Sequence, residues 1–151
     1  MYLMFLAPFE QGGDFRDSGI LGIERFLSRV WNLNQKSKIK NQNDNVKIKN
    51  EPIDKILHKT IKKVTEDIKN LHYNTAISSL MILLNEMEKD QNQVSNATRQ
   101  IFLKLLAPFA PHMTEELWSE LGNKGSTPLE IARPKGPSGA QARARFLTGL
   151  V

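Results

Sequence analysis

The sequence predicts an all-α protein, an up-and-down helical bundle of four main helices with shorter helical pieces. Three observations support this fold class. Apolar residues recur at three- and four-residue steps over most of the chain. Prolines and glycines interrupt these stretches at intervals that suit helices. No stretch alternates apolar and polar residues for long enough to build a sheet. With 151 residues, 40% of them hydrophobic, the chain can form one domain with its own core.

The N-terminal part predicts a short helix, a loop and a long helix. Residues 1–7 are expected to end a helix before Pro8, because the residue before a proline disfavours helical geometry. Residues 8–17 contain a proline, two glycines and three acids, and are expected to form a loop. A full helix is then expected over 18–34. Its predicted apolar stripe comprises Ile20, Ile23, Leu27, Val30 and Trp31.

Residues 36–50 interrupt the helical pattern. Lysine and asparagine dominate this stretch, and its few apolar residues lack helical spacing. Such a composition buries too little apolar surface to offset the entropy of ordering. We therefore expect a solvated, disordered loop; a second lysine-rich helix remains the alternative.

Two amphipathic helices are expected next, over 52–71 and 74–87. Pro52 suits the first turn of a helix, where its missing N–H group is not needed. Asn74 is the expected cap of the second helix. Because so few residues join them, the two helices should pack antiparallel. The stripe predicted for the first comprises Ile53, Leu57, Ile61, Val64, Ile68 and Leu71.

The C-terminal part predicts two shorter helices and a tail. The helices are expected over 97–106 and 112–121, separated by two prolines, with Gly122 just past the end of the second. Residues 132–151 are rich in Ala, Gly, Arg and Pro, unlike the rest of the chain. This segment is expected to be a disordered tail, a linker, or a junction created by an altered reading frame.

Charge and chemistry favour a binding module over an enzyme. The chain has 21 Lys and Arg against 16 Asp and Glu. The basic excess lies in 36–50 and 132–151, while the remainder is slightly acidic, so net charge alone does not indicate a nucleic-acid binder. The absence of cysteine excludes thiolate metal sites, and the three histidines lack ligand spacing. From the residues alone we expect no catalytic site, no metal, no cofactor and no membrane span.

Four stretches carry a more specific signal. They are HKTIKKVTEDI (58–68), NTAISSLMILLNEM (74–87), LLAPFAPHMTEELW (105–118), and MFLAPFEQ (4–11) followed by SGILGIERFLSRVW (18–31). Together they closely resemble the anticodon-binding domain of bacterial-type leucyl-tRNA synthetases, over about residues 2–131. Prolines and polar residues match as well as apolar ones. The resemblance implies the helical bundle of class I synthetases, in agreement with the pattern above.

The resemblance also implies a parent enzyme, a leucine–tRNA ligase of the cytoplasm that uses ATP and Mg²⁺ to join leucine to its tRNA. That chemistry belongs to a domain with HIGH and KMSKS motifs, and this sequence contains neither. The chain is therefore expected to be inactive alone, and to be a piece truncated at both ends. Its partners would be the leucine-accepting tRNA and the catalytic domain, in cis or as a split chain. The expected domains are a junction from the absent catalytic domain (1–17), the bundle with its loop (18–131) and the tail (132–151).

The function that the resemblance leaves to this piece is docking of tRNA through phosphate contacts, which position the nucleic acid without reading its sequence. The alternative is that the predicted cations are solvated, with partners four residues on, as in Lys62 with Glu66 and Lys63 with Asp67. The predicted tRNA-binding residues are Arg25, Arg29, Lys55, Lys59, Lys62 and Lys63.

Trp31 and Trp118 adjoin apolar stripes, so both are expected in the core and not as platforms for base stacking. A stand-alone helical adaptor and a non-functional gene remnant remain alternatives to the synthetase fragment. Neighbouring reading frames would discriminate between them.

Overall fold

The computed structural model describes residues 1–7, 17–38, 51–89, 94–123 and 128. Helices account for nearly all of these ranges, and no strand occurs within them, so the predicted all-α bundle is confirmed. The helices are α1 (Tyr2–Leu6), α2 (Asp17–Lys38), α3 (Glu51–Lys69), α4 (Tyr73–Lys89), α5 (Asn96–Leu106) and α6 (Pro111–Glu120).

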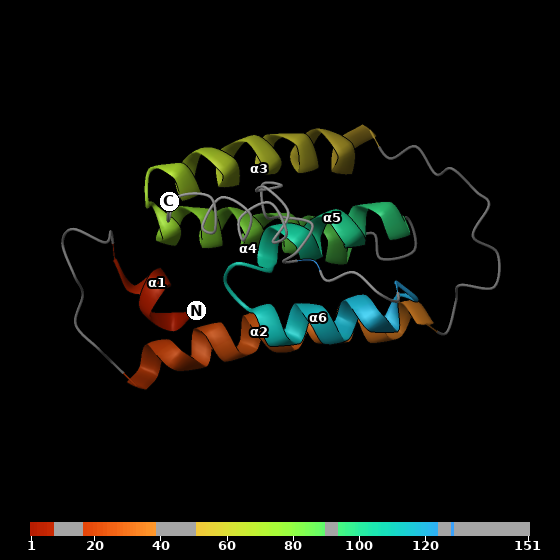
Figure 1. Ribbon diagram of the computed structural model, residues 1–151, viewed down its shortest axis with the longest axis horizontal. Coiled ribbons are helices and arrows are strands. Elements are labelled where there is room, and N and C mark those ends of the chain that lie inside the picture. Colours follow the sequence, from red (N-terminus) through yellow and green to blue (C-terminus); the bar gives the residue numbers. More distant parts are fainter. Residues whose placement is uncertain (8–16, 39–50, 90–93, 124–127, 129–151) are drawn as a thin grey trace, which may run out of the picture.

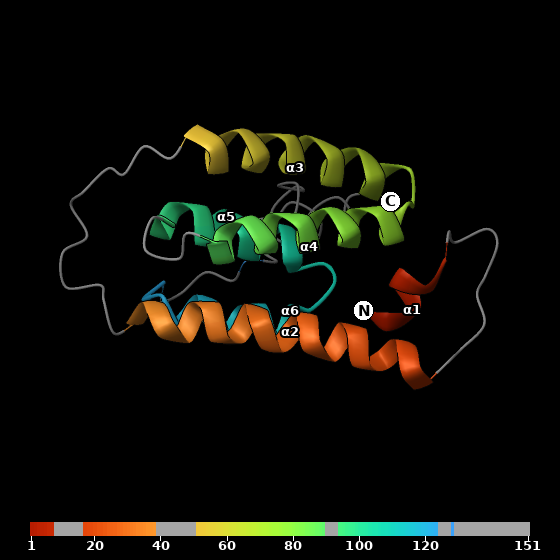
Figure 2. The ribbon, with the colours of Figure 1, turned by 180° about the vertical axis from the view of Figure 1, so that it is seen from behind.

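The helices lie in layers with α4 near the middle. Figure 1 shows α3 along one edge, α2 and α6 along the opposite edge, and α4 and α5 between them. Figure 2 shows the same order from behind. The α3–α4 pair forms the largest helix–helix contact and is antiparallel, as the short connection predicted. The short helix α1 packs against both α4 and α2.

Helix α4 supplies the centre of the core. It packs against α1, α2, α3 and α5, so more than one of its faces is covered. Fully burying an aliphatic side chain contributes roughly 1.5–3 kcal/mol relative to leaving it exposed. This helix is therefore the main source of the apolar burial that holds the others together. Its buried side chains are Ala76, Ile77, Leu80, Leu83, Leu84 and Met87.

Helix α2 differs from its prediction in both face and length. Its buried apolar side chains are Ile23, Phe26, Val30 and Leu33. Ile23 and Val30 are buried as predicted. The face is rotated relative to the rest of the predicted stripe, because Ile20 and Trp31 are exposed and Leu27 is only partly buried. The helix also continues to Lys38, so the first residues of the predicted loop over 36–50 are helical.

Helix α3 buries a stripe that includes polar residues. Ile53, Leu57 and Val64 are buried as predicted, but Thr60 and Asp67 are buried with them. The stripe was expected to reach Leu71, which is instead exposed and lies beyond the end of the helix. A carboxylate replaces an apolar group at the last buried position of the face, and it requires polar partners there.

The connection between α3 and α4 closes α3 with a left-handed residue. Leu71 has φ 60°, a conformation that an L-residue adopts at some cost in free energy. The His72 N–H donates to the Asp67 carbonyl at 2.7 Å, and the Leu71 N–H donates to the Ile68 carbonyl at 3.2 Å. These two bonds form a Schellman motif, in which glycine usually occupies the left-handed position. The motif thus satisfies the carbonyl groups of Asp67 and Ile68 in the last turn of α3.

The start of α4 lies before the predicted cap. The helix begins at Tyr73, and the Ala76 N–H donates to the His72 carbonyl at 3.2 Å. Asn74 therefore lies inside the first turn, and the prediction that it caps the helix is wrong. The Schellman motif ends at His72 and α4 begins at the next residue. No residue therefore lies between them to act as a separate cap.

The two C-terminal helices follow their predictions closely. Ser95 caps α5, because its hydroxyl accepts a hydrogen bond from the Thr98 N–H at 3.1 Å. Pro111 occupies the first position of α6, where its missing N–H is not needed. Gly122 follows the end of α6 with φ 83°, as expected of a residue just past a helix.

Three predicted segments lie wholly or largely outside the described residues. They are the loop over 8–17, the remainder of the loop over 36–50, and the tail over 132–151. The boundaries proposed for the three domains remain predictions as well. Within the described helices, none is both long enough and apolar enough to cross a membrane.

The left-handed residue at the end of α3 gives a prediction about stability. In the Leu71→Gly variant, relief of the left-handed strain, about 1–2 kcal/mol, should exceed the entropy that glycine adds to the unfolded chain. Leu71 is exposed, so little burial is lost. We expect the free energy of unfolding in urea, followed by circular dichroism, to rise by about 0.5–1 kcal/mol.

The matched control is the Gly122→Ala variant. It places a side chain at the other residue with positive φ among the described residues, where a Cβ meets no neighbouring atom. Any loss should then come from backbone strain alone, and we expect about 1 kcal/mol. A Leu71→Gly variant less stable than the parent would contradict the strain at Leu71.

Candidate nucleic-acid interface

The six predicted tRNA-binding cations lie on two helices. Arg25 and Arg29 belong to α2, and the four predicted lysines belong to α3. These helices occupy opposite edges of the bundle, with α4 between them, in both views (Figures 1 and 2). The structure therefore does not gather the six cations on one face. The two sets must be considered separately as candidate contacts to a nucleic acid.

Three of the α3 lysines form a continuous basic surface, which we call the lysine stripe. Lys55, Lys59 and Lys62 follow one another at four- and three-residue steps, so they share one side of the helix. All three are exposed, and within the described ranges none forms an ion pair. The predicted pair of Lys62 with Glu66 is not among the described salt bridges. The lysine stripe is thus available to an external anion.

One lysine missed by the prediction extends this side of α3. Lys69 is exposed and lies seven residues beyond Lys62, two helical turns on along the same side. Glu66 is exposed between them and offsets part of their charge. The same helical spacing that identified the lysine stripe could have identified Lys69.

Lys63 is held by its own domain. Its Nζ atom lies 3.1 Å from each carboxylate oxygen of Asp67, one turn further along α3. The Asp67 side chain is only 8% exposed, whereas that of Lys63 is 50% exposed. A poorly solvated carboxylate needs positive or donor partners, so this contact is worth more than an ordinary surface pair. The alternative of an internal partner, left open from the sequence, is confirmed for Lys63.

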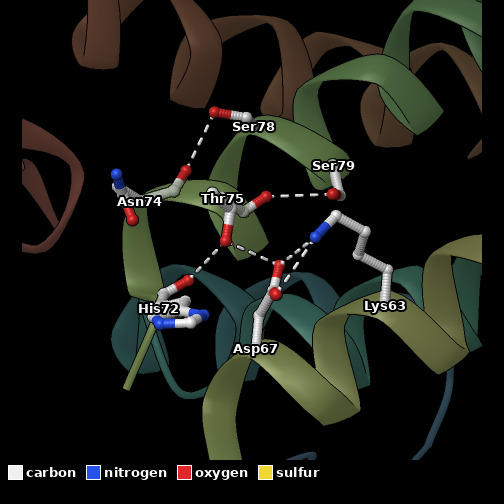
Figure 3. Close-up of polar contacts among 7 residues, drawn as sticks. All are labelled: Lys63, Asp67, His72, Asn74, Thr75, Ser78 and Ser79. Carbon is white, nitrogen blue, oxygen red and sulfur yellow. Dashed lines mark hydrogen bonds and ion pairs between the residues drawn. The ribbon is translucent and has the colours of Figure 1, made fainter. Parts of the chain in front are cut away.

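A second donor ties Asp67 to the start of α4. The Thr75 hydroxyl lies 2.8 Å from Asp67 Oδ2 and 2.9 Å from the His72 carbonyl oxygen. Figure 3 shows Lys63 and Thr75 approaching the same carboxylate from α3 and α4. The hydroxyls of Ser78 and Ser79 instead donate to carbonyl groups one turn back in α4. Asp67 therefore stabilises the α3–α4 hairpin. Lys63 contributes to this stabilisation because it binds the same carboxylate.

Arg29 is also held by its own domain. Its Nε atom lies 3.1 Å from both carboxylate oxygens of Glu88, and Nη2 bonds the same carboxylate. Nη2 also lies 2.5 Å from Asn85 Oδ1. The hydrogen bond to Glu88 raises the pKa of the Arg29 guanidinium, against a lesser opposing effect of partial burial. Arg29 joins α2 to α4, although its side chain is still 41% exposed.

The predictions for Arg25, Trp118 and Trp31 have different outcomes. Arg25 is exposed on α2 and has no salt bridge among the described residues. Trp118 is buried, as predicted, and Lys104 lies 5.4 Å from its ring centroid. The prediction that Trp31 is in the core is wrong, because this side chain is 36% exposed. It follows Val30, at the centre of the buried face, and one residue turns a helix by about 100°.

The partners of Arg29 were not foreseen from the sequence. Glu88 and Asn85 lie 59 and 56 residues away along the chain, and nothing in the local pattern pairs them with Arg29. Only the packing of α2 against α4 brings them together. Within the described ranges, no group of three or more His, Asp or Glu residues could hold a metal ion.

Comparisons with known proteins place this domain in a family. A family model described as the anticodon-binding domain of tRNA ligase matches residues 51–145. The leucine–tRNA ligase of Chlorobaculum parvum is 46% identical over 126 residues, which cover 83% of this chain and 16% of that protein. The leucine–tRNA ligase of Dehalococcoides mccartyi is 42% identical over 131 residues, with the same coverage of both chains.

A solved structure agrees with these sequence matches. The leucyl-tRNA synthetase agnB2 of Agrobacterium radiobacter K84, in a ternary complex with tRNA and LeuAMS, superposes with a TM-score of 0.71 at 28% identity. The superposition covers 93% of this chain and 20% of that one. The chain thus spans about one sixth of the length of the curated relatives it matches. It belongs to the family of anticodon-binding domains of tRNA ligases and within that family resembles the domain of leucine–tRNA ligases.

Proposed function

We propose that this chain is a tRNA-docking module of a leucine–tRNA ligase and that the lysine stripe on α3 is its contact with the tRNA backbone. The observation that carries the proposal is the set of three exposed, unpaired lysines on one side of a helix in a domain of this family. The related synthetase was crystallised with tRNA, which supports tRNA as the partner. Lysine ammonium groups suit phosphate oxygens and bind them without reading sequence.

The structure narrows the set of residues proposed for this contact. Lys55, Lys59 and Lys62 have no competing internal partner, whereas Lys63 and Arg29 are bound to carboxylates of the domain. Arg25 is available but lies on the opposite edge of the bundle. A rigid duplex surface bound to α3 would not reach Arg25 across the bundle. The lysine stripe is therefore the proposed contact with the tRNA. Arg25 could contact only a different part of the tRNA.

The chemistry of leucylation would belong to parts of the ligase outside this chain. In such an enzyme ATP and Mg²⁺ would bind where the HIGH and KMSKS motifs lie, and neither motif occurs in this sequence. The contribution of this domain is then to hold the tRNA in position, which is a binding contribution to catalysis. A cytoplasmic location accords with this role in protein synthesis.

Neutralising the lysine stripe tests the proposal. RNA affinity falls with salt by about 0.7–0.9 log units per phosphate neutralised for each tenfold rise in salt. The variant with Lys55, Lys59 and Lys62 replaced by Ala should therefore flatten the log–log slope by roughly 2–2.7. The measurement is fluorescence anisotropy of a leucine-accepting tRNA over a salt series. Helicity should not change, because all three side chains are exposed.

Lys89→Ala is the matched control. Lys89 is exposed on α4 and already pairs with Glu86, so its loss should leave the slope unchanged. If the triple variant binds tRNA with the parent slope, the lysine stripe is not the contact. The basic segments at 36–50 or 132–151 would then carry the binding.

Releasing Arg29 gives a second prediction of opposite sign. In the Glu88→Gln variant the carboxylate that holds the guanidinium becomes neutral, so Arg29 can bind a phosphate instead. If α2 approaches the tRNA, the salt slope should steepen by about 0.7–0.9. The Glu116→Gln variant is the control, because Glu116 is exposed on α6 and has no salt bridge among the described residues, so its loss releases no cation. A flatter slope in Glu88→Gln would mean that Glu88 orients Arg29 toward the RNA and does not compete with it.

A third prediction concerns catalysis. The chain alone should show no leucine-dependent exchange of pyrophosphate into ATP, because the motifs for that reaction are not in its sequence. The full-length Chlorobaculum parvum ligase, assayed in parallel, provides the positive control. Exchange above background that co-purifies with the 151-residue chain would overturn the assignment of catalysis to other parts of the enzyme.

A further inference from the structure

One titratable side chain of α3 lies among the lysines of the lysine stripe. His58 is exposed, three residues after Lys55 and four residues before Lys62. Side chains three and four residues apart are neighbours on a helix surface, with about 5–6 Å between their Cβ atoms. The imidazole of His58 therefore lies between two ammonium groups, on the side of α3 that is proposed to contact the tRNA backbone.

His58 has no partner within the part of the domain that the structure describes. Its side chain forms no ion pair and no hydrogen bond with the described residues. Asp54 lies one turn before it on α3, but no ion pair joins the two side chains. The other histidines of the sequence lie elsewhere, His72 in the connection after α3 and His112 on α6. His58 is thus the histidine that the lysine stripe can use.

The helices packed against α3 do not engage His58 electrostatically. These helices are α4 and α5. The α4 carboxylates already bind cations of their own, and the charged side chains of α5 are either buried or placed over an aromatic ring. None of them pairs with His58 among the described residues. The charged groups concerned are Glu86, Glu88 and Lys89 on α4, and Arg99 and Lys104 on α5.

An imidazole differs from an ammonium group because its charge changes near neutral pH. A histidine side chain ordinarily gains its proton around pH 6.5, whereas a lysine side chain stays charged over the whole neutral range. A phosphate oxygen binds a charged donor more strongly than a neutral one. A phosphate held between Lys55 and Lys62 would lie beside the His58 ring as well, and it would favour the protonated form.

We propose that His58 is a proton-dependent member of the tRNA contact, which takes up a proton when the RNA backbone binds. The proposal rests on the proposed function, since it takes the lysine stripe as the contact. Below about pH 6.5 the imidazolium adds a fourth positive charge to the three lysines, and above that pH the lysines act without it. The affinity for tRNA therefore increases as the pH falls, and RNA binding and proton binding favour each other.

The test measures the salt dependence of tRNA affinity at two pH values. Fluorescence anisotropy of a leucine-accepting tRNA, labelled with a dye insensitive to pH, is followed over a salt series at about pH 5.5 and about pH 8. For the parent chain, the log–log slope should be steeper by about 0.7–0.9 at the lower pH, because one more phosphate is neutralised. At fixed low salt the affinity should rise by about threefold to tenfold, as for one added charge that meets one phosphate.

Two substitutions fix the charge at this position. His58→Gln should keep the shallow slope at both pH values, because an amide has no charge to gain. His58→Arg should have the steep slope at both, because a guanidinium stays charged throughout. His112→Gln is the matched control, since it removes an exposed histidine on α6 and should keep the pH dependence of the parent. Circular dichroism at both pH values checks that helicity is unchanged.

Three results would overturn the role of His58. They are a parent slope that does not depend on pH, a pH dependence that persists in His58→Gln or His58→Arg, and a pH dependence lost in His112→Gln. Asp54 and Glu66 are present in all of these variants, so protonation of their carboxylates cannot produce a difference between them.

Failure of the proposed function is detected separately at about pH 8, where a histidine side chain is ordinarily neutral. If replacing Lys55, Lys59 and Lys62 by Ala leaves the slope unchanged at that pH, the lysine stripe is not the contact. If this triple variant flattens the slope but the parent shows no pH dependence, the lysine stripe stands and only the role of His58 is rejected.

Discussion

The burial of α4 on several sides is the constraint on which the rest of the structure depends. Helices α1, α2, α3 and α5 all pack against it, and its inward side chains are completely buried. Replacing one such leucine by alanine typically costs 2–5 kcal/mol, a large part of the stability of a small domain. The orientation of α3 relative to α2 follows from this shared centre, and with it the positions of their charged faces. The left-handed conformation of Leu71 costs free energy, but it reverses the chain in a short connection. Helix α4 can then pack directly against α3.

Some cations that could bind a nucleic acid instead stabilise the packing of this domain. Asp67 secures the α3–α4 hairpin and Glu88 secures the contact of α2 with α4, and each takes a cation to do so. A carboxylate that is poorly solvated holds its partner more firmly than one on the surface. Lys63 and Arg29 are consequently structural in the free domain. The cations that remain available to phosphate are those that no carboxylate of the domain binds.

The chemistry of the lysine stripe suits the partner proposed for it. Ammonium groups on α3 attract phosphate over a distance and tolerate water, which suits a contact with RNA that positions without reading sequence.

The sequence alone determined the helical class, the order of the helices and most of their ends, because helical spacing and capping residues such as Pro111 and Gly122 act locally. It also determined which lysines share a side of α3. The buried side of α2 was predicted only in part. Ile23 and Val30 are buried as expected, but Trp31 is exposed, because only the neighbouring helices decide which apolar residues are covered. Tertiary structure alone paired Arg29 with Glu88 across 59 residues, since ion pairs between helices depend on packing and leave no periodic signal.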